Sequence, residues 1–167
     1  MFTFVPEYYF NTYKDASPEF LISIGVKGIV LDIDNTLEPY EHPKAGEEVI
    51  SWFGKLKAAG IKTAIVSNNN AERVNTFNEE FNMPAYPDGA KPFKTNILKA
   101  IADMGVTKEE AILMGDQIFT DVWAAHNAGI PAILVPPIKD KKDIFTRFKR
   151  LLEYPIIMSY KKKRGSK

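Results

Sequence analysis

Two aspartates stand two residues apart at the end of an apolar run. They are Asp32 and Asp34 in the stretch LDIDNTL, and the run before them has the composition of a buried strand. Later apolar runs also end in polar groups, Ser67 after TAIV and Asp116 after AILMG, while Lys91 precedes a segment with helical periodicity. Ligands of open parallel sheets bind outside the carboxyl ends of the strands, so these side chains are expected to converge.

Carboxylates brought together in this way repel one another unless they share a cation. At an effective dielectric constant of about 20, like charges about 4 Å apart repel by about 4 kcal/mol. Oxygen ligands without histidine or cysteine favour a hard ion, so we expect Mg2+, held by Asp32, Asp34 and Asp116. Asp121, a turn beyond Asp116, is a further candidate, either as a ligand or as a hydrogen-bonding partner of one.

Magnesium and clustered carboxylates suit phosphoryl transfer. Asp32 is expected to act as the nucleophile and to form an aspartyl-phosphate. Asp34 is expected to protonate the leaving oxygen and later to activate water. Ser67, Asn68 and Lys91 are the predicted phosphate-binding residues, Asn68 through its backbone.

The elements that must position these residues alternate between short β-rich runs and amphipathic helices. This pattern predicts an α/β fold, a Rossmann-like three-layer sandwich with helices on both faces of a mainly parallel sheet. Five strands are predicted, over residues 28–33, 62–67, 85–86, 111–115 and 131–135. Helices are predicted over residues 47–59, 71–81, 92–104 and 120–127, with a short one upstream that Ser17 would cap.

Composition limits the class of protein. With 167 residues, 45% of them hydrophobic, residues 1–167 are expected to form a single domain with one core. The chain has no cysteine, which fits a reducing compartment, so we expect a cytoplasmic protein. No apolar run approaches the ~20 residues that span a bilayer, and MFTFVPEYYF lacks the basic flank and clean apolar core of a signal peptide, so we expect a soluble protein.

The charge is unevenly distributed. Residues 1–138 contain 11 Lys/Arg and 18 Asp/Glu, a net charge of −7, whereas residues 139–167 contain 11 and 3, a net charge of +8. This basic end also carries an apolar stripe at helical spacing: Ile144, Phe145, Phe148, Leu151 and Leu152.

Two interpretations of the basic end stay open. Its helix could pack the apolar stripe on the sheet and leave its charges in water. Alternatively, it could contact an anionic membrane peripherally, at the inner face of the cell membrane. Nucleic acid is not an expected partner, because the tail KKKRGSK has no aromatic residue to stack on bases.

The polar motifs resemble those of the haloacid dehalogenase superfamily. DIDNT, Ser67 after a strand, Lys91 before a helix and GDQIFTD occur in that order within about residues 26–135. In that superfamily an acid at the position of Asp34 is typical of phosphatases, so the resemblance implies a magnesium-dependent phosphatase. Only 35 positions separate Asp32 from Ser67, and 24 separate Ser67 from Lys91, which implies a member without a cap domain and with an open site.

At finer detail, GVKGIVLDIDNTL, VSNN and GDQIFTD resemble the YqeG-type branch of subclass IIIA, which is similar to phosphatidylglycerophosphate phosphatases. The resemblance therefore implies a phosphorylated lipid head group as substrate. A soluble sugar or nucleotide phosphate remains an alternative, as does a binding or regulatory protein of this fold with weak turnover. A second copy of the chain, in a homo-oligomer, could also cover the open site.

The loop after the first motif is where an uncapped enzyme would contact its substrate. Glu38, Tyr40 and His42 are the candidate contacts there, with ordinary loop chemistry around Pro39 and Pro43 as the alternative. His126 is far in sequence from the other histidine and is assigned no role.

Overall fold

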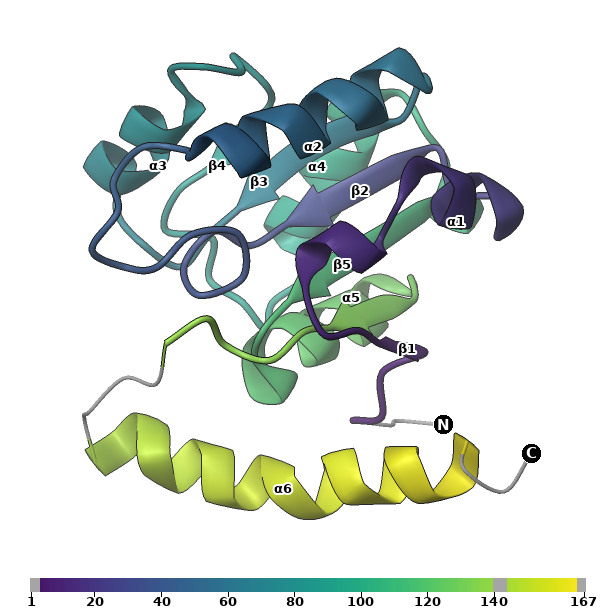
Figure 1. Cartoon of the computed structure of the whole chain (residues 1–167), viewed down its shortest axis with the longest axis vertical. Helices are drawn as coiled ribbons and strands as arrows, with labels where there is room; N and C mark the ends of the chain where they lie inside the picture. Colours follow the sequence, from purple (N-terminus) through teal and green to yellow (C-terminus); the bar gives the residue numbers. More distant parts are fainter. Residues whose placement is uncertain (1–3, 140–143, 165–167) are drawn as a thin grey trace.

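A parallel sheet forms the centre of the molecule (Figure 1). The structure is a computed structural model that describes residues 4–139 and 144–164. Within these residues the sheet has six strands in the order β1-β6-β5-β2-β3-β4, and every pairing is parallel. The strands are β1 (Tyr8–Tyr9), β2 (Gly28–Leu31), β3 (Lys62–Val66), β4 (Ala85–Tyr86), β5 (Ala111–Gly115) and β6 (Ala132–Leu134). The predicted α/β class is therefore confirmed.

The prediction of five strands misses the edge strand β1. Tyr8 and Tyr9 pair with Ile133 and Leu134 of β6, at the far end of the sheet. A two-residue strand is too short to show an alternation of apolar and polar residues, so the sequence pattern could not predict it.

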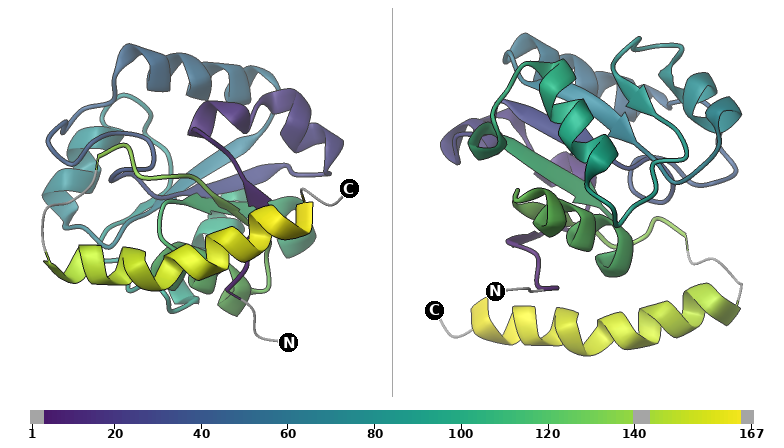
Figure 2. Two further views of the ribbon diagram at one scale, coloured as in Figure 1. Left: turned by 60° about the horizontal axis from the view of Figure 1, so that its bottom comes forward. Right: turned by 180° about the vertical axis from the view of Figure 1, so that it is seen from behind.

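Helices cover both faces of the sheet (Figures 1 and 2). The described α-helices are α1 (Pro18–Ser23), α2 (Glu47–Ala58), α3 (Ala71–Asn78), α4 (Thr95–Met104), α5 (Trp123–Ala128) and α6 (Ile144–Arg164), and the short helical segments are η1 (Tyr13–Asp15), η2 (Lys108–Glu110) and η3 (Ile118–Val122). Ser17 caps α1 as predicted, its hydroxyl accepting from the Phe20 N–H at 3.2 Å. The predicted helix 120–127 is in fact η3 followed by α5, and helix 92–104 begins only at Thr95.

Two apolar clusters hold the three layers together. Alternate residues of β2 point to opposite faces, so Ile29 and Leu31 pack with α1, α2 and α3, whereas Val30 packs with α4 and α5. Between β2 and β3, and between β3 and α4, the chain adds no further domain, so the fold is uncapped as predicted.

The strand order reverses direction next to β2. The chain passes from β2 outward to β3 and β4, and then crosses to β5 on the other side of β2. Leu31 is paired with Met114, and the Asp32 N–H donates to the Met114 carbonyl at 3.1 Å. Asp32 and Asp116 therefore leave the sheet beside each other, at the switch point where ligands of this architecture bind.

The last helix, α6, crosses the outside of the body near β1 and α5 (Figures 1 and 2). Its inner face includes Ile156 and Ile157, which pack on the cluster with α4 and α5, and Tyr160, whose hydroxyl accepts from the Tyr9 N–H at 3.0 Å. None of the helices in the described ranges is long and apolar enough to cross a membrane.

Of the two interpretations of the basic end, the one in which the apolar stripe packs on the sheet does not hold for the described members of the stripe. Phe148, Leu151 and Leu152 are exposed, because α6 turns a mixed polar and apolar face to the body. The side chains of Ile144 and Phe145 lie outside the described part of the chain.

Candidate active site

A lysine bridges two buried aspartates at the carboxyl edge of the sheet. Asp32 directly follows β2, and its Oδ1 accepts from Lys91 Nζ at 2.7 Å. The same ammonium donates to Asp121 Oδ1 at 2.5 Å. All three side chains are almost completely buried, so the ion pairs are little screened by water.

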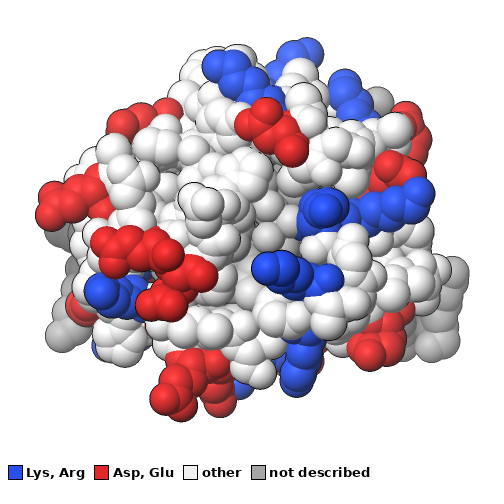
Figure 3. Space-filling model, turned by 90° about the horizontal axis from the view of Figure 1, so that it is seen from above, with Lys and Arg blue, Asp and Glu red and all other residues white. Residues whose placement is uncertain are grey.

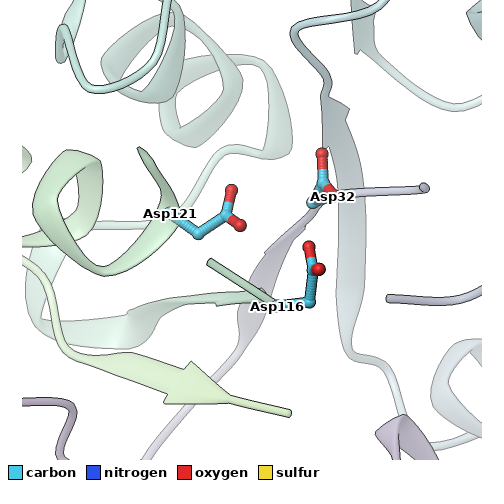
Figure 4. Close-up of side chains that lie close together, drawn as sticks. All are labelled: Asp32, Asp116 and Asp121. Atoms are coloured by element: carbon cyan, nitrogen blue, oxygen red, sulfur yellow. The ribbon is translucent and has the colours of Figure 1, made fainter. Parts of the chain in front are cut away.

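Asp116 completes a cluster of three carboxylates, which face one another in Figure 4. One oxygen from each of Asp32, Asp116 and Asp121 lies within 4.8 Å of the others. The approach of Asp121 requires a glycine at the end of β5, because a Cβ atom at Gly115 would collide with its carboxyl group. This close approach explains why the GDQIFTD motif begins with glycine.

A threonine that our sequence argument left without a role lies between two of these acids. Asn35, the residue before it, adopts a left-handed conformation, φ 62°, which asparagine tolerates better than most residues. Thr36 Oγ1 then lies 3.3 Å from Asp32 Oδ2 and 3.4 Å from Asp116 Oδ1. The threonine of the DIDNT motif was the sequence feature from which this contact with Asp32 and Asp116 could have been predicted.

Asp34 reaches the same pocket but has different partners. Its Oδ2 accepts from Asn69 Nδ2 at 2.8 Å and its Oδ1 accepts from Arg73 Nε at 3.0 Å. Arg73 also donates to the Pro43 carbonyl at 2.7 Å, so it ties α3 to the loop after β2. The carboxylate of Asp34 lies outside the cluster of three, and its part in metal binding stays a prediction.

Ser67 and Asn68 follow β3 at this edge. Ser67 is buried, and its Oγ accepts from the Asn69 N–H at 3.1 Å. The side-chain amide of Asn68 holds the Lys91 backbone at two points, accepting from its N–H at 2.8 Å and donating to its carbonyl at 3.1 Å. Asn68 therefore fixes the segment that carries the bridging ammonium.

These groups border a polar pocket of about 340 Å³. The lining residues are Asp32, Asp34, Asn35, Tyr40, Ser67, Asn68, Asn69, Lys91, Gln117, Thr120, Asp121 and Lys149.

Of the three loop candidates, the structure brings Tyr40 to the pocket lining. Glu38 is buried and turned into the loop, where its Oε1 accepts from the Gly46 N–H at 2.6 Å. His42 Nδ1 lies 3.4 Å from Glu38 Oε2, while His126, which received no role, lies 3.2 Å from Glu7.

The closely spaced, buried acids shift the pKa values of the ionisable groups in the site. Burial raises the pKa of Asp32 to about 6, with Asp121 and Asp34 adding to the rise and Lys91 opposing it. Burial and the charges of Asp121 and Asp32 raise the pKa of Asp116 to about 8 against the effect of Arg150. Burial alone would lower the pKa of Lys91, but Asp121 and Asp32 outweigh it and raise that pKa.

The donor set fits a divalent cation. The oxygens of buried acids with raised pKa values meet at one place, and a hard cation there would remove the repulsion that keeps protons on them. Asp121 is the acid least available to it, because Lys91 occupies its Oδ1 and the Gln117 N–H donates to its Oδ2 at 3.1 Å.

Arg150 of α6 is a second cation that the sequence argument missed. Its Nη2 donates to Asp116 Oδ2 at 2.8 Å. It follows Asp116 by 34 positions, in a segment that showed only an apolar stripe and scattered charges, so no sequence signal pointed to the contact.

The chain matches a known family over most of its length. The model of the family described as "Haloacid dehalogenase-like hydrolase" matches residues 12–135. The chain belongs to this hydrolase family. A relative from Bacillus subtilis named "Probable phosphatase YqeG" is 37% identical over 160 residues, which cover 96% of this chain and 93% of that protein. The family predicted from the four motifs is confirmed.

Solved structures share the fold of this hydrolase. CbbY from Rhodobacter sphaeroides, in complex with phosphate, has a TM-score of 0.55 and 14% identity, covering 72% of this chain and 90% of that one. The cobalt-bound deoxy-D-mannose-octulosonate 8-phosphate phosphatase from Haemophilus influenzae has a TM-score of 0.51 and 12% identity, covering 78% and 88%. At these identities the likeness concerns the fold alone.

Proposed function

We propose that this hydrolase is a magnesium-dependent phosphatase that acts on a phosphomonoester through an aspartyl-phosphate. One observation carries the proposal: Asp32 and Asp34 line the same pocket, yet Asp32 is bonded to Lys91 and Asp34 to Arg73 and Asn69. Two carboxylates with different partners suit two different roles. The resemblance to a probable phosphatase supports the same conclusion.

In the first step, a carboxylate oxygen of Asp32 attacks phosphorus, and the bond from phosphorus to the ester oxygen breaks. Asp34 in its protonated form gives its proton to the leaving oxygen, which departs as an alcohol. Lys91, with Ser67 beside it, faces the same pocket and can hold the phosphoryl oxygens as their charge shifts.

In the second step, water attacks the phosphorus of the aspartyl-phosphate. Asp34, now ionised, accepts a proton from this water, while the bond between Asp32 and phosphorus breaks and inorganic phosphate forms. The contacts from Arg73 and Asn69 keep the Asp34 carboxylate in one place through both steps.

Asp32 and Asp116 would hold Mg2+, with Asp34 as the third predicted ligand, and Asp121 would serve as the partner of Lys91. When bound, the ion supplies positive charge that offsets the carboxylates and the phosphoryl group.

We further propose that the substrate is a phosphorylated lipid head group such as that of phosphatidylglycerophosphate. The uncapped pocket suits a phosphate at the surface of a larger assembly. Beside it, α6 turns five large hydrophobic side chains away from the body, each between 47% and 69% exposed: Phe148, Leu151, Leu152, Tyr154 and Met158. Lys149 of the same helix lines the pocket.

The charge around this apolar face favours an anionic membrane over a second copy of the chain. Residues 139–167 have a net charge of +8, and Glu153, the only acid of α6, is buried. Two such helices packed together would bring like charges together, whereas anionic lipids attract them. By contrast, the face over α2 in Figure 3 mixes acidic and basic side chains. We place the protein on the cytoplasmic side of such a membrane, consistent with its lack of cysteine.

A phosphate-release screen tests the function. It compares phosphatidylglycerophosphate in mixed micelles with sugar phosphates, nucleotides and an aryl phosphate, each with Mg2+ and with a chelator, and with the Asp32→Asn variant as control. We expect magnesium-dependent release that is fastest for the lipid. Preference for a soluble ester would replace the lipid by a soluble substrate, and no release from any ester would favour a binding or regulatory protein.

A further inference from the structure

Helix α6 holds the residue that begins the loop after β5. Arg150 Nη2 donates to Asp116 Oδ2 at 2.8 Å, and Nη1 donates to the main-chain carbonyl of Asp116 at 3.2 Å. The Asp116 carboxylate has no exposed surface, and the Arg150 side chain is 23% exposed. A planar guanidinium that bonds to two oxygens of one residue fixes both its backbone and its side-chain rotamer, which a lysine cannot do.

Glu153, three residues further along α6, holds the same loop at a second place. It is buried, its Oε1 accepts from the Ile118 N–H at 2.9 Å, and its Oε2 lies 3.8 Å from Arg150 Nη1. Ile118 begins η3, so this N–H belongs to the donors that a helix start leaves without an internal partner. A buried carboxylate is costly, and an attachment that served packing alone would not need one.

The contact with Arg150 determines which oxygen of Asp116 remains for other partners. Oδ2 is bonded to Arg150, whereas Oδ1 lies 3.4 Å from Thr36 Oγ1, which is itself 3.3 Å from Asp32 Oδ2. Oδ1 is therefore the oxygen turned toward Asp32, the side on which the two acids can share a cation.

We propose that Arg150 is a positioning residue for the metal-binding carboxylate of Asp116, and that α6 is thereby a part of the active site. This inference rests on the proposed metal-dependent function. Arg150 contacts Oδ2 and the main-chain carbonyl of Asp116, and it leaves Oδ1, the oxygen beside Thr36, for other partners. Hydrogen-bonded partners of ligands commonly change metal affinity by about 10- to 100-fold.

Metal affinity of the intact chain tests this role without turnover. Mn2+, which also prefers oxygen ligands, serves as the probe, and electron paramagnetic resonance measures the free ion. We expect Arg150→Ala to weaken Mn2+ binding about 10-fold or more. Arg150→Lys keeps the charge but cannot bond to both oxygens, so we expect an intermediate affinity. Arg147→Ala, at an exposed position of the same helix, is the matched control and should bind as the wild type does.

Each outcome decides a separate question. If the wild type binds no Mn2+, the proposed metal site itself is wrong. If the wild type binds but Arg150→Ala binds equally well or more tightly, the positioning role is wrong, and tighter binding would mean that Arg150 opposes the ion. Should circular dichroism show that Arg150→Ala is unfolded, Arg150→Lys decides alone, and an unchanged affinity in that variant overturns the inference.

Discussion

Two cations meet the buried acids of this site, and they reach them in different ways. Lys91 comes from the loop before α4 and bridges Asp32 and Asp121 at the edge of the sheet. Arg150 comes from α6, which crosses outside the sheet, and contacts Asp116 alone among these acids. We call the residues at the carboxyl edge of the sheet, Asp32, Asp34, Ser67, Lys91 and Asp116, the rim, and helix α6, which carries Arg150, the arm.

The rim and the arm have different tasks: the rim carries the residues proposed to react, and the arm holds one of them in position. The rim contains the groups proposed to contact a phosphoryl group, Asp32, Asp34, Ser67 and Lys91, all of which line the pocket. The arm contributes one lysine to the lining but mainly holds the loop at Asp116 and turns an apolar face outward. Changes in the rim should therefore stop turnover, whereas changes in the arm should alter metal affinity or location.

The largest effect is expected at the centre of the rim. Asp32→Asn should reduce hydrolysis of a soluble aryl phosphate by at least about 10³-fold, because an amide is a poor nucleophile and a poor metal ligand. The fold should survive, since the amide can still accept from Lys91. Circular dichroism and a phosphate-release assay check both points, and retained turnover would rule out Asp32 as the nucleophile.

Asp34→Asn should lower steady-state turnover by about 10²-fold, within the usual range for loss of a general acid and base. Binding of phosphate analogues should remain, because the amide can still occupy the position between Asn69 and Arg73. Inhibition by vanadate together with steady-state rates separates the two effects. A wild-type rate in this variant would contradict the acid and base role.

Asp116 and Asp121 should differ in their effect on the metal. Asp116→Ala should raise the Mg2+ concentration for half-maximal activity by about 10-fold or more, the scale on which lost metal contacts act. Asp121→Ala should change it less, because Lys91 and the Gln117 N–H donate to the two oxygens of Asp121 at 2.5 and 3.1 Å, whereas Oδ1 of Asp116 has, among the described residues, only the longer contact with Thr36 Oγ1 at 3.4 Å. Magnesium titrations of both variants decide, and negligible shifts in both would remove Asp116 from the site.

What the sequence predicts follows the same division between rim and arm. Parallel strands end at one edge, so the order of motifs was enough to bring Asp32, Lys91 and Asp116 together. The contacts of Arg73 with Asp34 and of Arg150 with Asp116 could not be predicted in this way. Each arginine lies on a helix, and the packing of that helix on the body determines what the side chain meets. The same limit left the surroundings of the apolar stripe of α6 open, since helical periodicity defines an apolar face but not what that face contacts.

Without metal, stability should fall as the pH rises. The pKa values of Asp32 and Asp116 are raised to about 6 and about 8 in the folded protein, whereas in the unfolded chain both ionise near 3.8. Between these values the folded state binds more protons, so the stability contributed by these two groups is fully present below about pH 4 and is lost as the pH rises through about 6 and then about 8. Thermal unfolding in a chelator at about pH 5 and pH 8 measures the slope. Asp116→Asn should flatten it, and an equal slope in that variant would contradict the assignment.

The smallest effect on the hydrolysis of a soluble ester is expected from changes at residues 161–167. Removing residues 161–167 deletes five of the 11 basic residues of the basic end, but it leaves Tyr160 on Tyr9 and touches no residue of the pocket. Hydrolysis of an aryl phosphate should therefore be nearly unchanged. Binding to anionic vesicles should weaken, because each basic residue near such a surface contributes about 1 kcal/mol.

Salt should mimic the truncation, since exposed charges are screened over about 8 Å at physiological ionic strength. Some binding should persist in both cases, because the apolar face of α6 remains. Co-sedimentation with anionic and neutral vesicles at low and high salt measures this. The control replaces Lys55 and Lys57, exposed on α2, by alanine, and should bind as the wild type does. If the full-length protein ignores anionic vesicles even at low salt, α6 does not contact a membrane, and a soluble phosphate ester becomes the better candidate substrate.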